Sequence, residues 1–222
     1  MKLQWFKRKK RNYPDFWLRY LEAFNSNKKE TIETTRFVAF DTETTGFDRK
    51  KDRILSIGAV SILNKSIKVK KSYEVYLKQD VFSRKTVEIH GILKTGALEK
   101  IDELEAITSF LDYIKDAVLV AHHANFDKNM VNEMLLRHGL GKLKNQFIDT
   151  GYLFSKSKHI IYRENLKDHY TLDDLCTELN VPITDRHTAS GDALITAVVF
   201  LKILARLNKR KQLNWDYLLN NR

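Results

Sequence analysis

Two acidic residues, Asp41 and Glu43, lie two positions apart in the stretch FVAFDTETTG, residues 37–46. The first four residues of this stretch favour a short buried strand, and the last three favour a turn. Because strand side chains alternate between two faces, Asp41 and Glu43 are expected to project from the same face. Two carboxylates about 4 Å apart repel by roughly 4 kcal/mol at an effective dielectric near 20. The pair therefore indicates a bound cation, a retained proton, or a strand end at which both acids point into solvent.

A third acid, Asp127, follows a predicted strand over residues 117–121 and opens a predicted helix over about 126–138. Val131 and Leu135 follow it at i+4 and i+8, so Asp127 belongs to the helix stripe that faces the sheet. An acid in the first turn of a helix also gains about 0.3–1 kcal/mol from the helix dipole. Taken alone, Asp127 is therefore explained by a structural capping role.

A fourth acid, Asp192, ends the segment HTASGD, residues 187–192, which opens a long predicted helix over about 188–206. From residue 193 to residue 201 no side chain is charged and only Thr196 is polar, so this helix is predicted to be buried nearly all round. A carboxylate in that setting is costly unless it is paired or binds a metal. His187 lies five residues earlier, where it can reach the same pocket. A helix N-cap network and a surface histidine are the structural alternatives for this segment.

The elements that carry these residues predict a mixed α/β fold. Three early strands with short connections indicate an antiparallel meander, and the later alternation of strands and helices indicates parallel strands added to it, with helices packed on the resulting mixed sheet. The first predicted strand begins at residue 37, and the others cover residues 54–60, 68–77, 117–121 and 147–149. The predicted helices cover residues 102–115, about 126–138, 171–179 and 188–206.

The candidate acids thus occur at strand ends and helix starts, where an α/β sheet presents its ligand crevice. Several carboxylates in one crevice cannot all stay ionised without cations. Oxygen-only ligands suit Mg²⁺ or Mn²⁺. The nearby His187 is not needed as a ligand, so it is free to act as a general base.

Composition points to a nucleic-acid partner inside the cell. The chain has 222 residues, 43% of them apolar, and a net charge of +11, which favours a polyanion: nucleic acid first and acidic membranes second, with a generally lysine-rich composition as the alternative. Cys176 is the only cysteine, which excludes an intrachain disulfide and argues against a cysteine-based zinc site. No apolar stretch is long enough for a membrane span, and the basic run at residues 7–11 does not fit a secretory signal. We therefore predict a cytoplasmic protein without membrane association.

Residues 1–35 are predicted to form a basic, aromatic helical appendage to a main domain over residues 36–222. A helix is expected to begin near Pro14, and Phe16, Tyr20 and Phe24 recur on it every four residues. Such an aromatic stripe must dock, and the main domain is the expected surface, with a second copy or a partner as alternatives.

Three segments resemble the exonuclease motifs of the DEDD superfamily, in the family order: FDTETTG at residues 40–46, HHANFD at 122–127 and HTASGD at 187–192. His187, five residues before the last acid, is similar to the histidine of the DnaQ-like (DEDDh) branch, which includes the proofreading epsilon subunit of bacterial DNA polymerase III. The resemblance spans roughly residues 36–206. It implies a ribonuclease-H-like fold and a 3′–5′ exonuclease that uses two divalent ions, Mg²⁺ or Mn²⁺, and releases nucleoside 5′-monophosphates.

The same resemblance implies roles for individual residues. Asp41 would bridge both metals, and Glu43 and Asp192 would hold the first. Asp127 would hold the second, and His187 would deprotonate the attacking water.

On the substrate side, Thr44 and Gly46 match positions that approach the terminal nucleotide through their backbone. His90, in the segment IHGI at residues 89–92, resembles a substrate-side position of epsilon-like members. His123 occupies a position where many relatives carry asparagine, which would alter contacts near the second metal or the 3′ end.

These observations favour an exonuclease that acts on the 3′ end of single-stranded DNA, in proofreading or repair, with a DNA polymerase as a candidate partner. One alternative is a 3′–5′ exoribonuclease that acts on small RNA. The other is a non-catalytic module that binds nucleic acid or a polymerase. The complete set of crowded acids argues against the module, because a domain freed from catalysis has no reason to keep them. The sequence does not indicate an oligomeric state.

Overall fold

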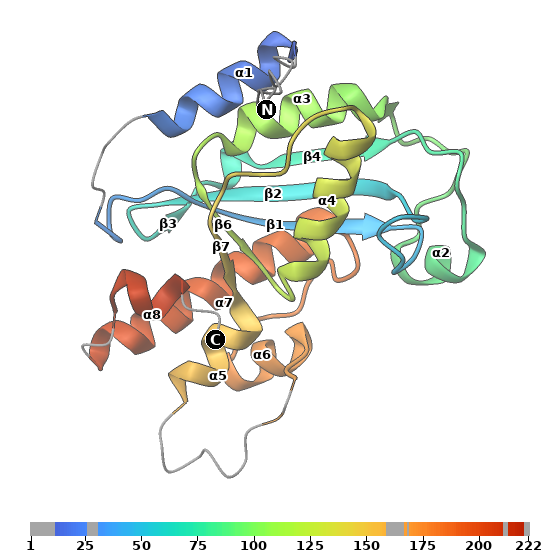
Figure 1. The fold of residues 1–222 in the computed structure, drawn as a ribbon. Helices are drawn as coiled ribbons and strands as arrows, with labels where there is room; N and C mark the ends of the chain where they lie inside the picture. The colour runs from blue at the N-terminus through green and yellow to red at the C-terminus, as the bar shows by residue number, and fades with distance from the viewer. Residues whose placement is uncertain (1–11, 26–30, 159–166, 168, 211–212, 220–222) are drawn as a thin grey trace, which may run out of the picture.

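The structure, a computed structural model, describes residues 12–25, 31–158, 167, 169–210 and 213–219. Within these residues seven strands form one mixed sheet, in the order β5-β4-β2-β1-β6-β7, with the short β3 paired to β2 (Figure 1). The strands are β1 (Phe37–Thr44), β2 (Ile54–Leu63), β3 (Ser66–Ile67), β4 (Tyr73–Leu77), β5 (Lys100–Ile101), β6 (Val118–Ala121) and β7 (Phe147–Asp149).

The sheet is mixed in the way that the element pattern predicts. Strand β1 pairs antiparallel with β2, and β2 pairs antiparallel with β4, which gives the meander. Strand β6 pairs parallel with β1, and β7 pairs parallel with β6. The predicted α/β class with a meander and added parallel strands is confirmed. Strand β1 therefore lies in the interior of the sheet, with a hydrogen-bonded neighbour on each side.

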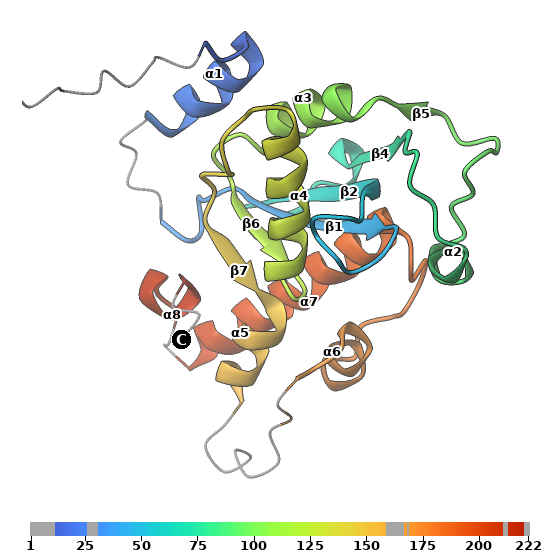
Figure 2. The same cartoon turned by 45° about the vertical axis from the view of Figure 1, so that its right-hand side comes forward.

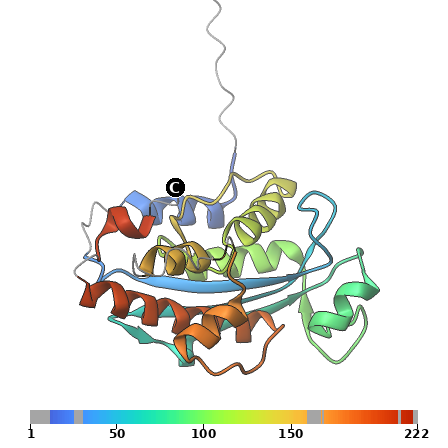
Figure 3. The ribbon, with the colours of Figure 1, turned by 90° about the horizontal axis from the view of Figure 1, so that it is seen from below.

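Helices cover both faces of the sheet. They are α1 (Asp15–Glu22), α2 (Arg84–His90), α3 (Glu103–Ile114), α4 (Asn125–Arg137), α5 (Thr150–Ser157), α6 (Leu172–Leu179), α7 (Ala189–Lys209) and α8 (Trp215–Leu219), with 3₁₀ turns η1 (Ala23–Asn25) and η2 (Val69–Lys71). Figure 3 shows α7 on the opposite side of the sheet from α3 and α4.

The side chains of β1 alternate between two separate hydrophobic cores. Val38 and Phe40 belong to the core under α3 and α4, whereas Phe37 and Ala39 belong to the core under α7. Continuing this alternation places Asp41 on the α7 side of the strand.

Helix α7 can approach the sheet closely because Gly58 lies beneath its first turn. Gly58 is the β2 residue opposite Asp41 in the antiparallel register. A Cβ added to Gly58 would lie 2.2 Å from the carbonyl carbon of Ala189 and 2.2 Å from the amide nitrogen of Ser190. Only glycine leaves room for this contact, which sets the start of α7 beside Asp41.

The aromatic stripe of α1 packs on the rest of the chain. Trp17 and Tyr20 are buried in the same core as α3 and α4. The Tyr20 hydroxyl donates to Asn145 Oδ1 at 2.6 Å and accepts from the Lys144 amide at 2.8 Å. The basic run at residues 7–11 lies outside the described residues, so the division at residue 35 stays a prediction.

Several local features differ from the sequence prediction. Residues 69–71, predicted as strand, form the turn η2, and the strand begins only at Tyr73. The helices α2, α5 and α8 and the short strands β3 and β5 were not predicted. Helix α5 follows β7 without a loop, because the Asp149 side chain caps it by accepting from the Tyr152 amide at 3.1 Å. In the part of the chain that the structure describes, no helix is long and apolar enough to cross a membrane.

Candidate active site

The carboxyl end of β1 opens into a pocket of about 630 Å³. Figure 2 shows α2 and α6 beside this end of β1, and both helices contribute to the pocket lining. All nine residues singled out from the sequence line it: Asp41, Glu43, Thr44, Gly46, His90, His123, Asp127, His187 and Asp192. The structure thus brings together segments that are up to about 150 residues apart in the chain, as the crevice argument requires. The individual chemical roles of these residues stay predictions.

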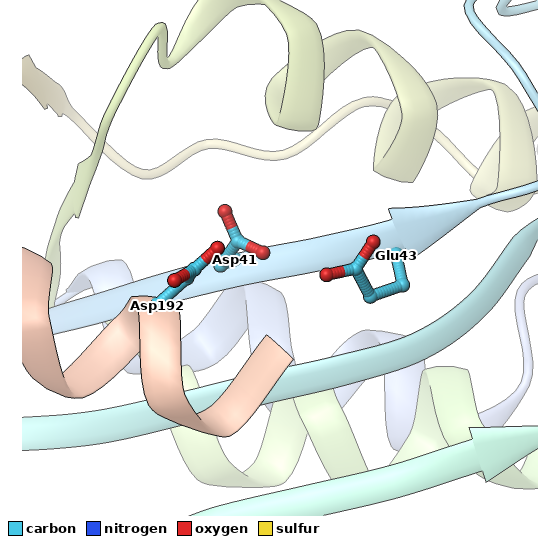
Figure 4. Close-up of side chains that lie close together, drawn as sticks. All are labelled: Asp41, Glu43 and Asp192. Carbon is cyan, nitrogen blue, oxygen red and sulfur yellow. The ribbon is translucent and has the colours of Figure 1, made fainter. Parts of the chain in front are cut away.

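Three of the acids form a tight group. One carboxylate oxygen from each of Asp41, Glu43 and Asp192 lies within 4.8 Å of the others. Figure 4 shows Asp41 and Glu43 on β1 and Asp192 on the adjacent turn of α7. This is the spacing at which three carboxylates can share one cation.

The pocket raises the pKa values of three carboxyl groups, those of Asp41, Glu43 and Asp127. The pKa of Asp41 is raised well above 3.8, first by loss of solvation and then by the charges of Asp127, Asp192 and Glu43. Loss of solvation and the charge of Asp192 raise the pKa of Glu43 to about 7. Arg186 opposes both shifts but does not cancel them. Without a further cation, the surroundings therefore favour the protonated form of both groups.

Asp127 approaches β1 from the α4 side. It is 3% exposed, and its Oδ1 accepts from the Thr42 amide at 3.1 Å and from the Thr42 hydroxyl at 2.7 Å. Burial raises the pKa of Asp127 to about 7. Asp127 is not part of the three-acid group, and its charge acts on Asp41 from the other side. This placement fits a second cation position that shares Asp41 with the first.

His187 lies in the turn that leads into α7, with a left-handed backbone at φ 62°. The turn is held by Thr188, whose hydroxyl donates to the Asp185 carbonyl at 2.7 Å and accepts from the Gly191 amide at 3.1 Å. The N-cap of α7 is thus Thr188, so Asp192 does not serve as the cap. His187 is left exposed at the rim of the pocket, where it can contact a substrate or water.

The carboxylate of Asp192 shows whether the site is suited to a metal ion. Its Oδ2 contacts Arg186, but its Oδ1 is buried without a hydrogen-bond partner among the described residues. A buried carboxylate oxygen with no donor is unfavourable unless an ion binds there. Together with the other two acids of the group, this oxygen fits an oxygen-ligated divalent ion.

Sequence reasoning missed two aromatic side chains of the pocket. Phe47 is 83% exposed, and its ring packs on Phe126 with centroids 5.8 Å apart. Both rings line the pocket, so together they offer an apolar surface that a ligand in the pocket could contact. The signal in the sequence was the position of each phenylalanine, directly after Gly46 and directly before Asp127.

Sequence reasoning also missed the residues that shape the turn between β6 and α4. The Asp149 side chain accepts from the Ala124 amide at 2.8 Å, and His122 Nδ1 lies 3.0 Å from the Thr150 hydroxyl oxygen. Burial, followed by the charge of His123, lowers the pKa of His122 to about 4. His122 is therefore neutral near pH 7 and serves as a packing and hydrogen-bonding group in this turn. His123 has a left-handed backbone at φ 56°, which presents its ring to the pocket beside His122.

The chain has clear relatives. The family model described as Exonuclease matches residues 38–200. The chain is similar to the DNA polymerase III PolC-type of Caldanaerobacter subterraneus subsp. tengcongensis, with 35% identity over 174 residues that cover 78% of this chain and 12% of that protein. It therefore spans only a small part of the length of the curated relatives that it matches.

Solved structures share the fold. The structure of E. coli Exonuclease I in complex with a dT13 oligonucleotide matches with a TM-score of 0.67 and 15% identity, over 80% of this chain and 43% of that one. Exonuclease X in complex with 5′ overhanging duplex DNA matches with a TM-score of 0.59 and 22% identity, over 84% of this chain and 98% of that one.

Proposed function

The chain belongs to the exonuclease family, and from this premise we propose that it is a metal-dependent 3′–5′ exonuclease that releases nucleoside 5′-monophosphates. The matched segment, residues 38–200, contains every residue that lines the pocket. The observation that carries the proposal is the three-acid group. Within this group, Asp192 Oδ1 is buried and accepts no hydrogen bond from the described residues.

The acids divide into two cation positions. Asp41, Glu43 and Asp192 would hold one Mg²⁺ or Mn²⁺ ion, and Asp127 together with Asp41 would hold the second. Such ions, when bound, lower the pKa of an attacking water and stabilise the charge that develops on the phosphoryl group. The raised pKa values of Glu43 and Asp127 mean that protons compete with the ions for these oxygens.

The remaining pocket residues would handle the water and the nucleotide. His187, exposed at the rim, accepts the proton of the attacking water in its neutral form. The Phe47 and Phe126 rings offer a stacking surface for unpaired bases, which favours a single-stranded 3′ end. Thr44 and Gly46, on β1 and in the turn after it, line the pocket where the terminal nucleotide would lie. His90 and His123 complete the proposed substrate side.

DNA is the proposed substrate, with RNA as the alternative. The fold neighbours named above were solved with DNA, and the relatives are DNA polymerases, which supports a proofreading or repair setting with a polymerase partner.

The test uses 5′-labelled DNA and RNA oligonucleotides of one sequence, each incubated with the protein in Mg²⁺, in Mn²⁺ and in EDTA. We expect stepwise shortening from the 3′ end, release of nucleoside 5′-monophosphates, a faster rate on DNA, and no cleavage in EDTA. Asp41→Asn is the matched inactive control. Binding without cleavage in either metal would show that the chain is a binding module instead, and faster degradation of RNA would reverse the substrate assignment.

A further inference from the structure

Arg186 lies inside the proposed metal site, next to His187 in the chain. Its Nη1 forms an ion pair with Asp192 Oδ2, and its Nε donates to Asp173 Oδ1 at 2.7 Å. The Arg186 side chain is 18% exposed and that of Asp192 is 9% exposed, so their contact is largely shielded from water. Asp173, in the first turn of α6, is 55% exposed. One guanidinium thus connects a buried acid of the site to an acid at the surface.

Arg186 is the permanent cation of the pocket. Among the described residues that line the pocket, no other is a lysine or an arginine. A guanidinium does not lose its proton in proteins, so its charge is present whether or not a metal ion is bound. Its charge lowers the pKa of Asp41 and of Glu43, against the larger effects that raise them. In the metal-free protein, Arg186 therefore provides part of the charge balance that a metal ion would otherwise provide.

A divalent ion bound at Asp192 Oδ1 would lie close to the guanidinium that pairs with Oδ2 of the same carboxylate. Two cations on the same carboxylate repel each other strongly in a shielded pocket. Asp173 offers Arg186 another partner, because the Nε contact already exists and Asp173 has solvent around it. Rotation of the guanidinium toward Asp173 would relieve this repulsion and leave both oxygens of Asp192 to the ion, while the arginine stays paired.

We propose that Arg186 is an internal counter-ion that holds Asp192 in the metal-free protein and competes with the divalent ion for it, with Asp173 as its release partner. This proposal rests on the proposed metal site. It assigns Arg186 to positioning and not to catalysis. The metal concentration that the protein requires would then depend on how Arg186 divides its pairing between Asp192 and Asp173. The two neighbours of Arg186 have opposite effects: Asp192 retains the guanidinium over the site, and Asp173 draws it away.

The test measures Mn²⁺ binding by isothermal titration calorimetry, with metal-free protein and no nucleic acid. Arg186→Gln removes the competitor, and we expect Mn²⁺ to bind about tenfold more tightly, the size of one lost charged hydrogen bond. Arg186→Lys keeps a charge without the forked geometry and should lie between wild type and Arg186→Gln. Asp173→Asn removes the release partner and should weaken Mn²⁺ binding severalfold. The Asp173 variant leaves all the acids of the site in place, so it remains informative if Arg186→Gln fails to fold.

A second readout is thermal unfolding in EDTA and in saturating Mn²⁺. Arg186→Gln should lower the melting temperature in EDTA more than in Mn²⁺, because the lost ion pair exists only in the metal-free state. Unchanged or weaker Mn²⁺ binding by Arg186→Gln, or tighter binding by Asp173→Asn, would overturn the proposal. If the wild-type protein binds no Mn²⁺ at all, the proposed function fails instead. If the protein binds Mn²⁺ but does not cleave nucleic acid, the role proposed for Arg186 stands and only the proposed activity is refuted.

Discussion

Replacing Asp127 with asparagine is expected to stabilise the metal-free protein at neutral and alkaline pH while abolishing its proposed activity. The pKa of Asp127 is raised from 3.8 to about 7, chiefly by burial. Below about pH 4 the carboxyl group is protonated in both the folded and the unfolded chain, so its ionisation does not change the free energy of unfolding. Between about pH 4 and 7 the unfolded chain ionises while the folded chain keeps its proton, so stability falls as pH rises. Above about pH 7 the loss is complete.

The magnitude follows from the separation of the two pKa values. A pKa raised from 3.8 to about 7 corresponds to a loss of about 4 kcal/mol at pH 8, at a slope of about 1.4 kcal/mol per pH unit. Asparagine has almost the same shape and keeps an oxygen that can accept from the Thr42 amide and hydroxyl, which now donate to Asp127 Oδ1. The substitution therefore removes the ionisation and retains the hydrogen bonds.

The assay is urea unfolding of both proteins in EDTA at several pH values from 4 to 8. The difference in unfolding free energy should grow in favour of Asp127→Asn as pH rises to about 7 and then level off. In saturating Mn²⁺ the gap should shrink, because the ion stabilises the wild-type carboxylate. A difference that is independent of pH, or one that grows in favour of the wild type, would show that burial does not hold a proton on Asp127 and would refute this reasoning.

Three further changes test other parts of the site. Gly58→Ala should destabilise the fold by about 2 kcal/mol or more and weaken Mn²⁺ binding, because a Cβ at that position lies 2.2 Å from the backbone of Ala189; chemical unfolding and calorimetry measure both effects, and an alanine variant with wild-type values would contradict the close approach. Phe47→Ala should leave the free energy of unfolding within about 0.5 kcal/mol of the wild type, since the ring is 83% exposed. The same change should raise KM for single-stranded DNA about tenfold through lost stacking. An unchanged KM would show that the ring does not contact the substrate. His187→Gln should lower kcat by about 10²–10⁴-fold with Mn²⁺ affinity retained, and a variant with full kcat would exclude the histidine as the base.

The sequence located nine of the pocket residues because all of these except His90 lie in three short segments, each at an element boundary. Asp41 and Glu43 alternate with the buried side chains of β1, and Asp192 opens a helix with few other polar residues. These are local signals, and the order of strands and helices then predicts that they meet at one edge of the sheet.

What the sequence did not reveal depends on contacts between distant residues. The link from Arg186 to Asp173 and Asp192 exists only once α6 and α7 are packed together. Helix α5 was missed because its cap, Asp149, also ends a strand and provided no separate start signal. Residues 69–71 were assigned to a strand because Val69 alternates with lysines, although that region forms a 3₁₀ turn instead.

The alternation of β1 between two cores has a consequence for when the site can exist. Asp127 belongs to α4, on one face of the sheet, and Asp192 belongs to α7, on the opposite face. The four acids therefore come together only when helices have packed on both faces. During synthesis, β1 emerges from the ribosome about 150 residues before Asp192. A nascent chain that has not yet reached α7 therefore lacks Asp192, and its proposed metal site is incomplete. The proposed activity therefore requires that α7, the last long helix, has docked on the sheet.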